Sequence, residues 1–142
     1  MSNILEVKFS AKSENESLSR VIVASFAAKL DPTIEELSDI KTAVSEAVTN
    51  SIIHAYDEDD SKLVYLRCEI EDRTIKVVVE DRGHGIDDVE EAMQPMYTSK
   101  PELERSGMGF SFMESFMDSL KVISIKGEGT KVVMTKTIEL PK

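Results

Sequence analysis

Apolar and polar residues alternate along several short runs of the chain, and each alternating run predicts a half-buried β-strand. The runs lie at residues 4–10, 63–70, 75–80, 121–126 and 130–138. The second and third are separated by a polar turn at Asp72-Arg73, and the last two by Gly127-Glu128-Gly129. These short turns predict two antiparallel hairpins.

Apolar residues at helical spacing predict two helices between the first strand and the first hairpin. The first follows a capping-box spacing at Ser13 and Glu16 and ends at Asp31-Pro32. Its predicted apolar stripe consists of Leu18, Ile22, Phe26 and Leu30. The second begins with the same spacing at Thr33 and Glu36 and extends to about Ala55. Its predicted stripe consists of Leu37, Ile40, Val44, Ala47, Val48 and Ser51.

A third, short buried helix is predicted over residues 110–120. Between the third strand and this helix lies a polar, glycine-punctuated stretch, with only a short helix-like piece near residues 87–93. A long irregular segment in a small domain is typical of a functional loop, so we expect a lid at about residues 87–108. Helices and strands together predict an α/β fold, a two-layer sandwich with a mixed, mostly antiparallel sheet covered by helices on one face.

Composition narrows the class of protein. The 142 residues predict a single domain over 1–142. With 17 basic and 27 acidic side chains the net charge is −10, which argues against direct nucleic-acid binding. Cys68 is the only cysteine and has no disulfide partner in the chain. There is no apolar run of the ~20 residues that a membrane span needs, and no signal-peptide pattern opens the sequence. We therefore expect no membrane contact and a cytoplasmic location.

Three polar residues of the second helix lie one turn apart. Glu46, Asn50 and His54 are spaced i, i+4, i+8, so they form a ridge beside the apolar stripe. Such a ridge can be an ordinary solvated helix edge. It can also divide the work of a metal-nucleotide site, because an amide oxygen can ligate Mg²⁺ while a carboxylate orients or deprotonates a nucleophile.

Glycines punctuate the chain at three further places. Asp81-Arg82-Gly83-His84-Gly85 follows an apolar strand directly, where glycines permit close ligand approach and Asp81 offers an acceptor. This is no dinucleotide fingerprint, because the third glycine and the βαβ unit are missing, and no P-loop occurs. The other two places are Gly129-Thr130 in the last hairpin and Gly107-Met108-Gly109.

The glycines of Gly107-Met108-Gly109 precede the short helix, whose free amides could cradle a phosphate. Lys100 and Arg105 lie just upstream and could meet phosphate charge. Of the two, Arg105 is favoured because its fork can engage two phosphate oxygens.

Singly these patterns are also those of plain turns and surface cations, but their order along the chain is specific. The set resembles the Bergerat ATP-binding fold of gyrase, the heat-shock chaperone, histidine kinases and MutL, and residues 96–100 resemble the element before the lid of histidine kinases. Within this superfamily the chain is most similar to the anti-sigma F factors of endospore-forming bacteria. The matching stretches are residues 45–50, 53–54, 94–95 and 98–109.

The resemblance implies a role for each matching position. Asn50 would hold Mg²⁺, Asp81 would accept the adenine amino group, Thr130 would lie beside the adenine and Glu46 would be the catalytic base. The remaining implied nucleotide contacts are His54, Gly83, Gly85, Thr98, Ser99, Lys100, Ser106, Gly107, Met108 and Gly109, with Arg105 catalytic. The chain departs from histidine kinases after Gly109, where Phe110-Ser111-Phe112 replaces further glycines.

Resemblance further implies a sporulation protein with two activities. It would phosphorylate an anti-anti-sigma factor on serine with Mg-ATP, and it would bind and inhibit RNA polymerase sigma factor F as a homodimer, with ATP or ADP and Mg²⁺ as its cofactors. Arg20 faces away from the predicted stripe of the first helix and is the candidate partner contact. The alternatives are a nucleotide-gated ATPase and a non-catalytic binding module of the same fold.

Overall fold

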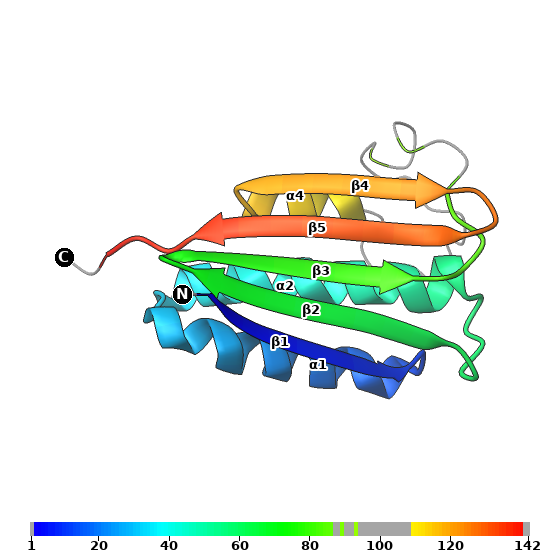
Figure 1. Ribbon diagram of the computed structural model, residues 1–142, viewed down its shortest axis with the longest axis horizontal. Coiled ribbons are helices and arrows are strands. Elements are labelled where there is room, and N and C mark those ends of the chain that lie inside the picture. Colours follow the sequence, from blue (N-terminus) through cyan, green and yellow to red (C-terminus); the bar gives the residue numbers. More distant parts are fainter. Residues whose placement is uncertain (1, 87–88, 90–92, 94–108, 141–142) are drawn as a thin grey trace.

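The structure is a computed structural model that describes residues 2–86, 89, 93 and 109–140 (Figure 1). In chain order the elements are β1 (Asn3–Ser10), α1 (Ser13–Ala27), the 3₁₀-helix η1 (Ala28–Leu30), α2 (Ile34–Thr49), the π-helix η2 (Asn50–Ala55), β2 (Leu63–Glu71), β3 (Thr74–Asp81), α4 (Gly109–Phe116), β4 (Ser119–Ile125) and β5 (Gly129–Thr137). None of the helices in the described part of the chain is long and apolar enough to cross a membrane.

The strands form one five-stranded sheet in the order β1-β2-β3-β5-β4, and every neighbouring pair is antiparallel. The helices lie together on one face of this sheet, as Figure 1 shows. The two-layer α/β sandwich predicted from the sequence is therefore confirmed, but the described sheet is antiparallel throughout and not mixed as predicted. Because β5 pairs with β3, the end of β3 lies beside the start of β5, with Asp81 opposite Thr130.

The core lies between the sheet and α2. Alternate residues of β2 point into it, and Cys68 among them is fully buried, which raises the pKa of its thiol to about 12. The predicted stripe of α2 faces the sheet, with Ala43 added to it and Leu37 only half-buried. This long apolar contact fixes α2 against the sheet, and every side chain on the polar edge of α2 is fixed with it.

The predicted face of the first helix is confirmed at Phe26 and Leu30, but its first half is displaced by one residue. Its buried residues are Ser19, Val23, Phe26 and Ala27, and Leu30 is buried in η1. Leu18 is 49% exposed. The predicted Ser13 capping box is absent as well, because the helix begins at Ser13 itself and its N-cap residue Lys12 makes no side-chain cap. Glu16 bonds instead to α2, where its carboxylate accepts a hydrogen bond from Ser45.

Two helix ends also differ from the prediction. The second helix does not run as one α-helix to Ala55, since it changes to a π-helix at Asn50. The third helix ends at Phe116, and Leu120 belongs to β4. By contrast, the Thr33–Glu36 capping box is confirmed in both directions, with Thr33 Oγ1 accepting from Glu36 N at 3.0 Å and Glu36 Oε1 accepting from Thr33 N at 2.9 Å.

Candidate functional site

A buried carboxylate lies where β3 ends. Asp81 is 4% exposed and accepts three hydrogen bonds. Its Oδ1 accepts from Gly83 N at 3.0 Å and from Thr130 N at 3.2 Å, and its Oδ2 accepts from Ser51 Oγ at 3.1 Å. Each carboxylate oxygen has two lone pairs, so Oδ2 keeps one free for a further donor. The carboxylate is thus held in one orientation and can accept one more hydrogen bond.

Burial dominates the electrostatics of Asp81. Removal from water raises the pKa of this carboxyl above its ordinary value, while the hydrogen bonds from Gly83, Ser51 and Thr130 oppose the rise. A buried acceptor of this kind favours a donor that arrives from a ligand, because the remaining lone pair has little access to water. An exocyclic amino group of a base is such a donor.

Glycines surround this carboxylate because no side chain would fit there. A methyl group on Gly83 would lie 2.3 Å from Ala55 O of η2, and one on Gly129 would lie 2.2 Å from Asp81 O. Gly85 has φ +81° and packs on Ile125 O, where a methyl group would be 2.5 Å away. The loop after β3 is therefore pressed between η2 and the β4–β5 turn. This explains the Asp-x-Gly-x-Gly spacing in physical terms.

Three polar side chains that the sequence analysis did not assign to the site complete this end of it. Ser51 was counted in the apolar stripe, but it bonds Asp81. Tyr56 Oη accepts from Arg82 N at 2.7 Å and donates to Leu63 O at 2.6 Å, which fixes the chain after Asp81. Ser124 Oγ contacts Thr130 Oγ1 at 2.8 Å and accepts from Ile86 N at 2.7 Å. The position of Ser51 on a core-facing stripe could have indicated its role, because a buried hydroxyl group requires a hydrogen-bond partner.

A second cluster joins α2 to the start of α4. A methyl group built on Gly109 would stand 3.2 Å from Asn50 Nδ2, 3.4 Å from Asn50 Oδ1 and 3.6 Å from Glu46 Oε2. The two side chains therefore converge on the first residue of α4, whose end carries backbone N–H groups without helical partners. A carboxylate, an amide and a helix N-terminus therefore lie together here, and two of the three residues of the predicted ridge, Glu46 and Asn50, contribute to this cluster. His54, also on the ridge, lies half-buried in η2.

The π-helix connects the two clusters. Asn50 and Ser51 are consecutive, yet Asn50 lies against Gly109 while Ser51 bonds Asp81. Single π-turns within α-helices occur frequently at functional sites. The wider turn begins at Asn50. From this point the segment contacts α4 through Asn50 and the end of β3 through Ser51.

The described residues fit a nucleotide with its metal. A base would reach the free lone pair of Asp81, and phosphates would lie toward the amide end of α4. Within the described ranges, no group of three His, Cys, Asp or Glu residues could hold a metal ion. Mg²⁺ bound to a nucleotide keeps several waters and needs only one or two protein ligands beside the phosphates, so the single amide oxygen of Asn50 is compatible with it.

Part of the predicted site lies outside the described residues. These positions are Thr98, Ser99, Lys100, Arg105, Ser106, Gly107 and Met108. The predicted lid at 87–108 is described only at Val89 and Met93. For the remaining positions, the structure brings Asp81, Gly83 and Thr130 together in one cluster and Glu46, Asn50 and Gly109 in the other.

Arg20 belongs to neither cluster and lies on α1. Its side chain is 40% exposed. The buried face of α1 is centred closer to Arg20 than was predicted, so Arg20 lies at the edge of that face and does not point straight away from the core. Arg20 Nε pairs with Glu16 Oε1 at 3.3 Å, and Arg20 Nη2 donates to Ser17 Oγ at 3.2 Å. A half-exposed arginine held in this way still offers donors to a partner.

Known proteins resemble this chain over nearly its whole length. Residues 9–136 match the histidine kinase-like ATPase domain family. The anti-sigma F factor of Clostridium perfringens is 61% identical over 136 residues, covering 96% of this chain and 97% of that protein. Those of Clostridium acetobutylicum and Oceanobacillus iheyensis are 59% and 54% identical, covering 99% and 100% of this chain and 97% of each relative.

A solved structure shares the fold. The crystal structure of the RsbU and RsbW domains of a Mycobacterium tuberculosis protein superposes with a TM-score of 0.69 at 17% identity, over 96% of this chain and 32% of that one. The present chain thus spans about a third of the chain in that solved structure. The family match covers residues 9–136, and the relatives are about 60% identical over nearly the whole chain. The chain therefore belongs to the histidine kinase-like ATPase family and, within it, to the anti-sigma F factors.

Proposed function

We propose that this protein is a Mg-ATP-dependent serine kinase of an anti-anti-sigma factor that also binds and inhibits sigma factor F during sporulation. The observation that carries the kinase activity is the convergence of Glu46 and Asn50 on Gly109. Nucleotide binding alone requires no carboxylate at the phosphate end of the site. A carboxylate beside a metal ligand is what transfer to a hydroxyl group requires.

In the proposed reaction, a serine hydroxyl of the partner approaches the γ-phosphorus of ATP from the side of Glu46. The Glu46 carboxylate accepts the hydroxyl proton as the new oxygen–phosphorus bond forms and the bond to the β–γ bridging oxygen breaks, leaving phosphoserine and ADP. Asp81 holds the adenine, and the amides at the start of α4 receive the phosphates. Mg²⁺ on Asn50 would supply neutralisation of phosphate charge.

Residues beyond the described ranges complete the proposal. We assign Arg105 to the γ-phosphate, and Lys100 with its neighbours to the lid side of the nucleotide, on the sequence alone. All 142 residues would act as one ATP-binding domain in the cytoplasm, and two copies would form a homodimer. Arg20 would contact a protein partner through its exposed face. The relatives named anti-sigma F factors support the sigma-binding activity.

Transfer of γ-labelled phosphate from Mg-ATP tests the proposal. The purified chain is added to an extract of sporulating host cells, and the labelled proteins are separated. We expect one small labelled protein with the label on serine. Release of free phosphate alone would favour a nucleotide-gated ATPase, and tight nucleotide binding without turnover would favour a non-catalytic binding module.

A further inference from the structure

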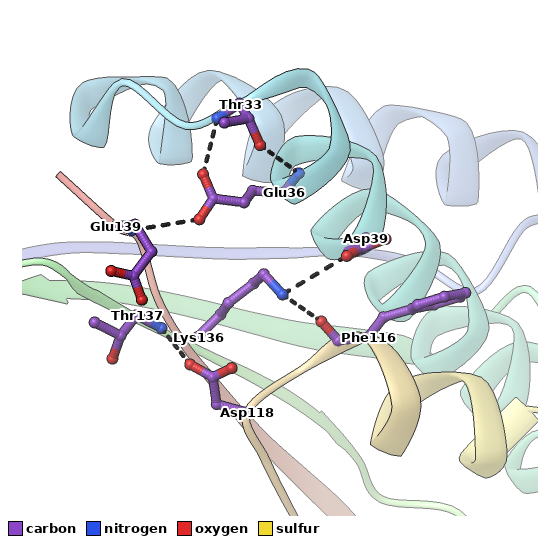
Figure 2. A network of polar contacts seen from close by, with 8 residues as sticks. All are labelled: Thr33, Glu36, Asp39, Phe116, Asp118, Lys136, Thr137 and Glu139. Carbon is purple, nitrogen blue, oxygen red and sulfur yellow. Dashed lines mark hydrogen bonds and ion pairs between the residues drawn. The ribbon is translucent and has the colours of Figure 1, made fainter. Parts of the chain in front are cut away.

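The end of α4 that is remote from the nucleotide site is held by a lysine from β5. Lys136 Nζ donates to Phe116 O, the last carbonyl of α4, at 2.7 Å, and lies 3.7 Å from Asp39 Oδ2 of α2 (Figure 2). The side chains of Lys136 and Asp39 are only 12% and 26% exposed. One ammonium group therefore joins three elements, β5, α4 and α2.

This position of the ammonium is favourable for two reasons. The last carbonyls of a helix lack helical partners, and Phe116 O is one of them. The C-terminal end of a helix also carries partial negative charge, which a cation stabilises within the last turn. With only eight residues, α4 has little length over which its own hydrogen bonds could fix its axis.

The chain that leaves α4 is fixed to the same strand. Asp118 N donates to Thr135 O at 2.8 Å, and Asp118 Oδ2 accepts from Thr137 N at 2.7 Å. Figure 2 shows Asp118 and Lys136 side by side below α2. On the α2 side, Glu36 Oε2 accepts from Glu139 N at 3.3 Å, so the segment after β5 is tied to α2 as well.

The opposite end of α4 is Gly109, which faces Asn50 and Glu46 of the α2–η2 segment. An eight-residue helix is about 12 Å long, so Phe116 and Gly109 are only about two turns apart, and we expect a displacement at Phe116 to reach Gly109. Asp39 and Glu46 belong to the same helix, α2. Lys136 thus fixes α4 relative to the helix that carries the proposed catalytic base.

We propose that Lys136 is a positioning residue for the nucleotide site, which keeps the amide end of α4 in register with Glu46 and Asn50. The effect on phosphate transfer rests on the proposed function, whereas the effect on nucleotide binding and on α4 itself does not. Lys136 would act through Phe116 O and Asp39, and not by direct contact with nucleotide or substrate.

The test compares four proteins at a temperature where all are folded. Lys136→Met keeps the aliphatic stem and removes the ammonium, Lys136→Arg restores charge and donors, and Lys76→Met removes an exposed lysine from β3 as the matched control. The readouts are the Kd for Mg-ATP, hydrogen exchange of the amides of residues 110–116 without nucleotide, and phosphate transfer. Asp39→Asn, which leaves the bond to Phe116 O in place, serves as a milder variant should Lys136→Met fold poorly.

We expect Lys136→Met to bind Mg-ATP roughly three- to tenfold more weakly, in line with the loss of a helix-end charge and its hydrogen bond. Exchange should quicken in α4 alone, Lys136→Arg should restore both readouts, and Lys76→Met should match the wild type. An affinity within twofold of wild type for Lys136→Met, or exchange that quickens equally throughout the chain, would overturn the proposal.

The outcomes also separate this inference from the proposed function. If the wild type transfers phosphate and Lys136→Met binds and transfers equally well, only the positioning role fails. If the wild type binds ATP in a Lys136-dependent manner but never labels a serine, the kinase activity fails and the positioning role is supported.

Discussion

Thr130 donates its backbone N–H to Asp81 Oδ1 at 3.2 Å, across the last residue pair of β3 and β5. The same oxygen accepts from Gly83 N, so two backbone groups from distant parts of the chain orient one buried carboxylate. The antiparallel pairing of β3 with β5 creates this arrangement. The Asp81 end of the site is therefore a product of sheet topology.

Asp81→Asn should abolish tight ATP binding while leaving the fold intact. The asparagine oxygen can replace Oδ1 and accept from Gly83 and Thr130, and its NH₂ group can donate to Ser51. That NH₂ group would then face the adenine amino group, and because both groups are donors no hydrogen bond can form between them. We expect roughly ten- to hundredfold weaker binding, measured by calorimetric titration, with an unchanged circular dichroism spectrum. Binding of wild-type strength would remove Asp81 from adenine recognition.

The same variant should change how stability depends on pH. Burial raises the pKa of Asp81 in the folded state above its ordinary value of 3.8. The folded state therefore holds this proton more tightly than the unfolded chain, and the stabilisation is complete below 3.8 and lost as pH rises through the folded pKa. Urea unfolding from pH 3.5 upward should show Asp81→Asn gaining stability relative to wild type as pH increases. Parallel curves for the two proteins would contradict this.

Gly129→Ala should destabilise the protein more than Gly127→Ala. Gly129 has φ +133° and a methyl group there would lie 2.2 Å from Asp81 O, whereas Gly127, with φ +83°, has open space around it. We expect a loss of roughly 2 kcal/mol or more in the free energy of unfolding for Gly129→Ala, and about 1 kcal/mol for Gly127→Ala from backbone strain alone. Denaturant unfolding measures both, and equal losses would show that the Asp81 contact costs nothing.

Glu46→Ala should separate binding from chemistry. Glu46 Oε2 lies near Gly109 and on the other side of Asn50 from the Asp81 cluster, so adenine binding should be kept. Loss of a general base slows proton transfer by about 10²–10⁴-fold, and we expect single-turnover transfer to fall within that range with little change in the Kd for ATP. The folded state is checked by thermal melting. An unaltered transfer rate would remove Glu46 from the mechanism.

Arg20→Glu should weaken partner binding without affecting ATP affinity. The substitution reverses a charge on α1 that is 40% exposed and places it beside Glu16, and neither the Asp81 contacts nor the Gly109 contacts include Arg20. We expect roughly tenfold weaker affinity for sigma factor F. The affinity is measured with immobilised sigma factor F in the presence of ATP. Lys62→Glu, an equal charge change at an exposed site, is the control. Equal loss of ATP binding in Arg20→Glu would indicate damage to the fold instead of a lost contact.

Periodicity predicted the layers of this fold well, because alternation and helical spacing report burial directly. It failed on the face of α1, where Ser19 is buried and Leu18 is exposed. The hydroxyl of Ser19 bonds Glu16 O of its own helix, so a polar residue could enter the core and shift the face. The change to a π-helix at Asn50 was also beyond prediction, since it follows from packing on α4 and β3, which are distant in sequence.

The site could be predicted residue by residue only where a motif fixed the roles. Asp81, Asn50 and Gly109 were assigned through the order of motifs along the chain, and the structure brings them to two adjoining clusters. Tyr56 and Ser124 carried no signal, because their partners are backbone and side-chain groups of other elements. Lys136 likewise could not be predicted, because its partners lie in α2 and α4 and no local sequence pattern indicates those contacts.

In the proposed complex, Asp81 and Asn50 hold opposite ends of one ATP molecule, with Glu46 at the reacting phosphate. A crystal structure of the chain with Mg²⁺ and a non-hydrolysable ATP analogue tests it most directly. We predict the adenine amino group in hydrogen-bond contact with the Asp81 carboxylate, the metal on Asn50 Oδ1 and the γ-phosphate beside Gly109. A nucleotide bound elsewhere, or a γ-phosphate remote from Glu46 and Asn50, would contradict the claim.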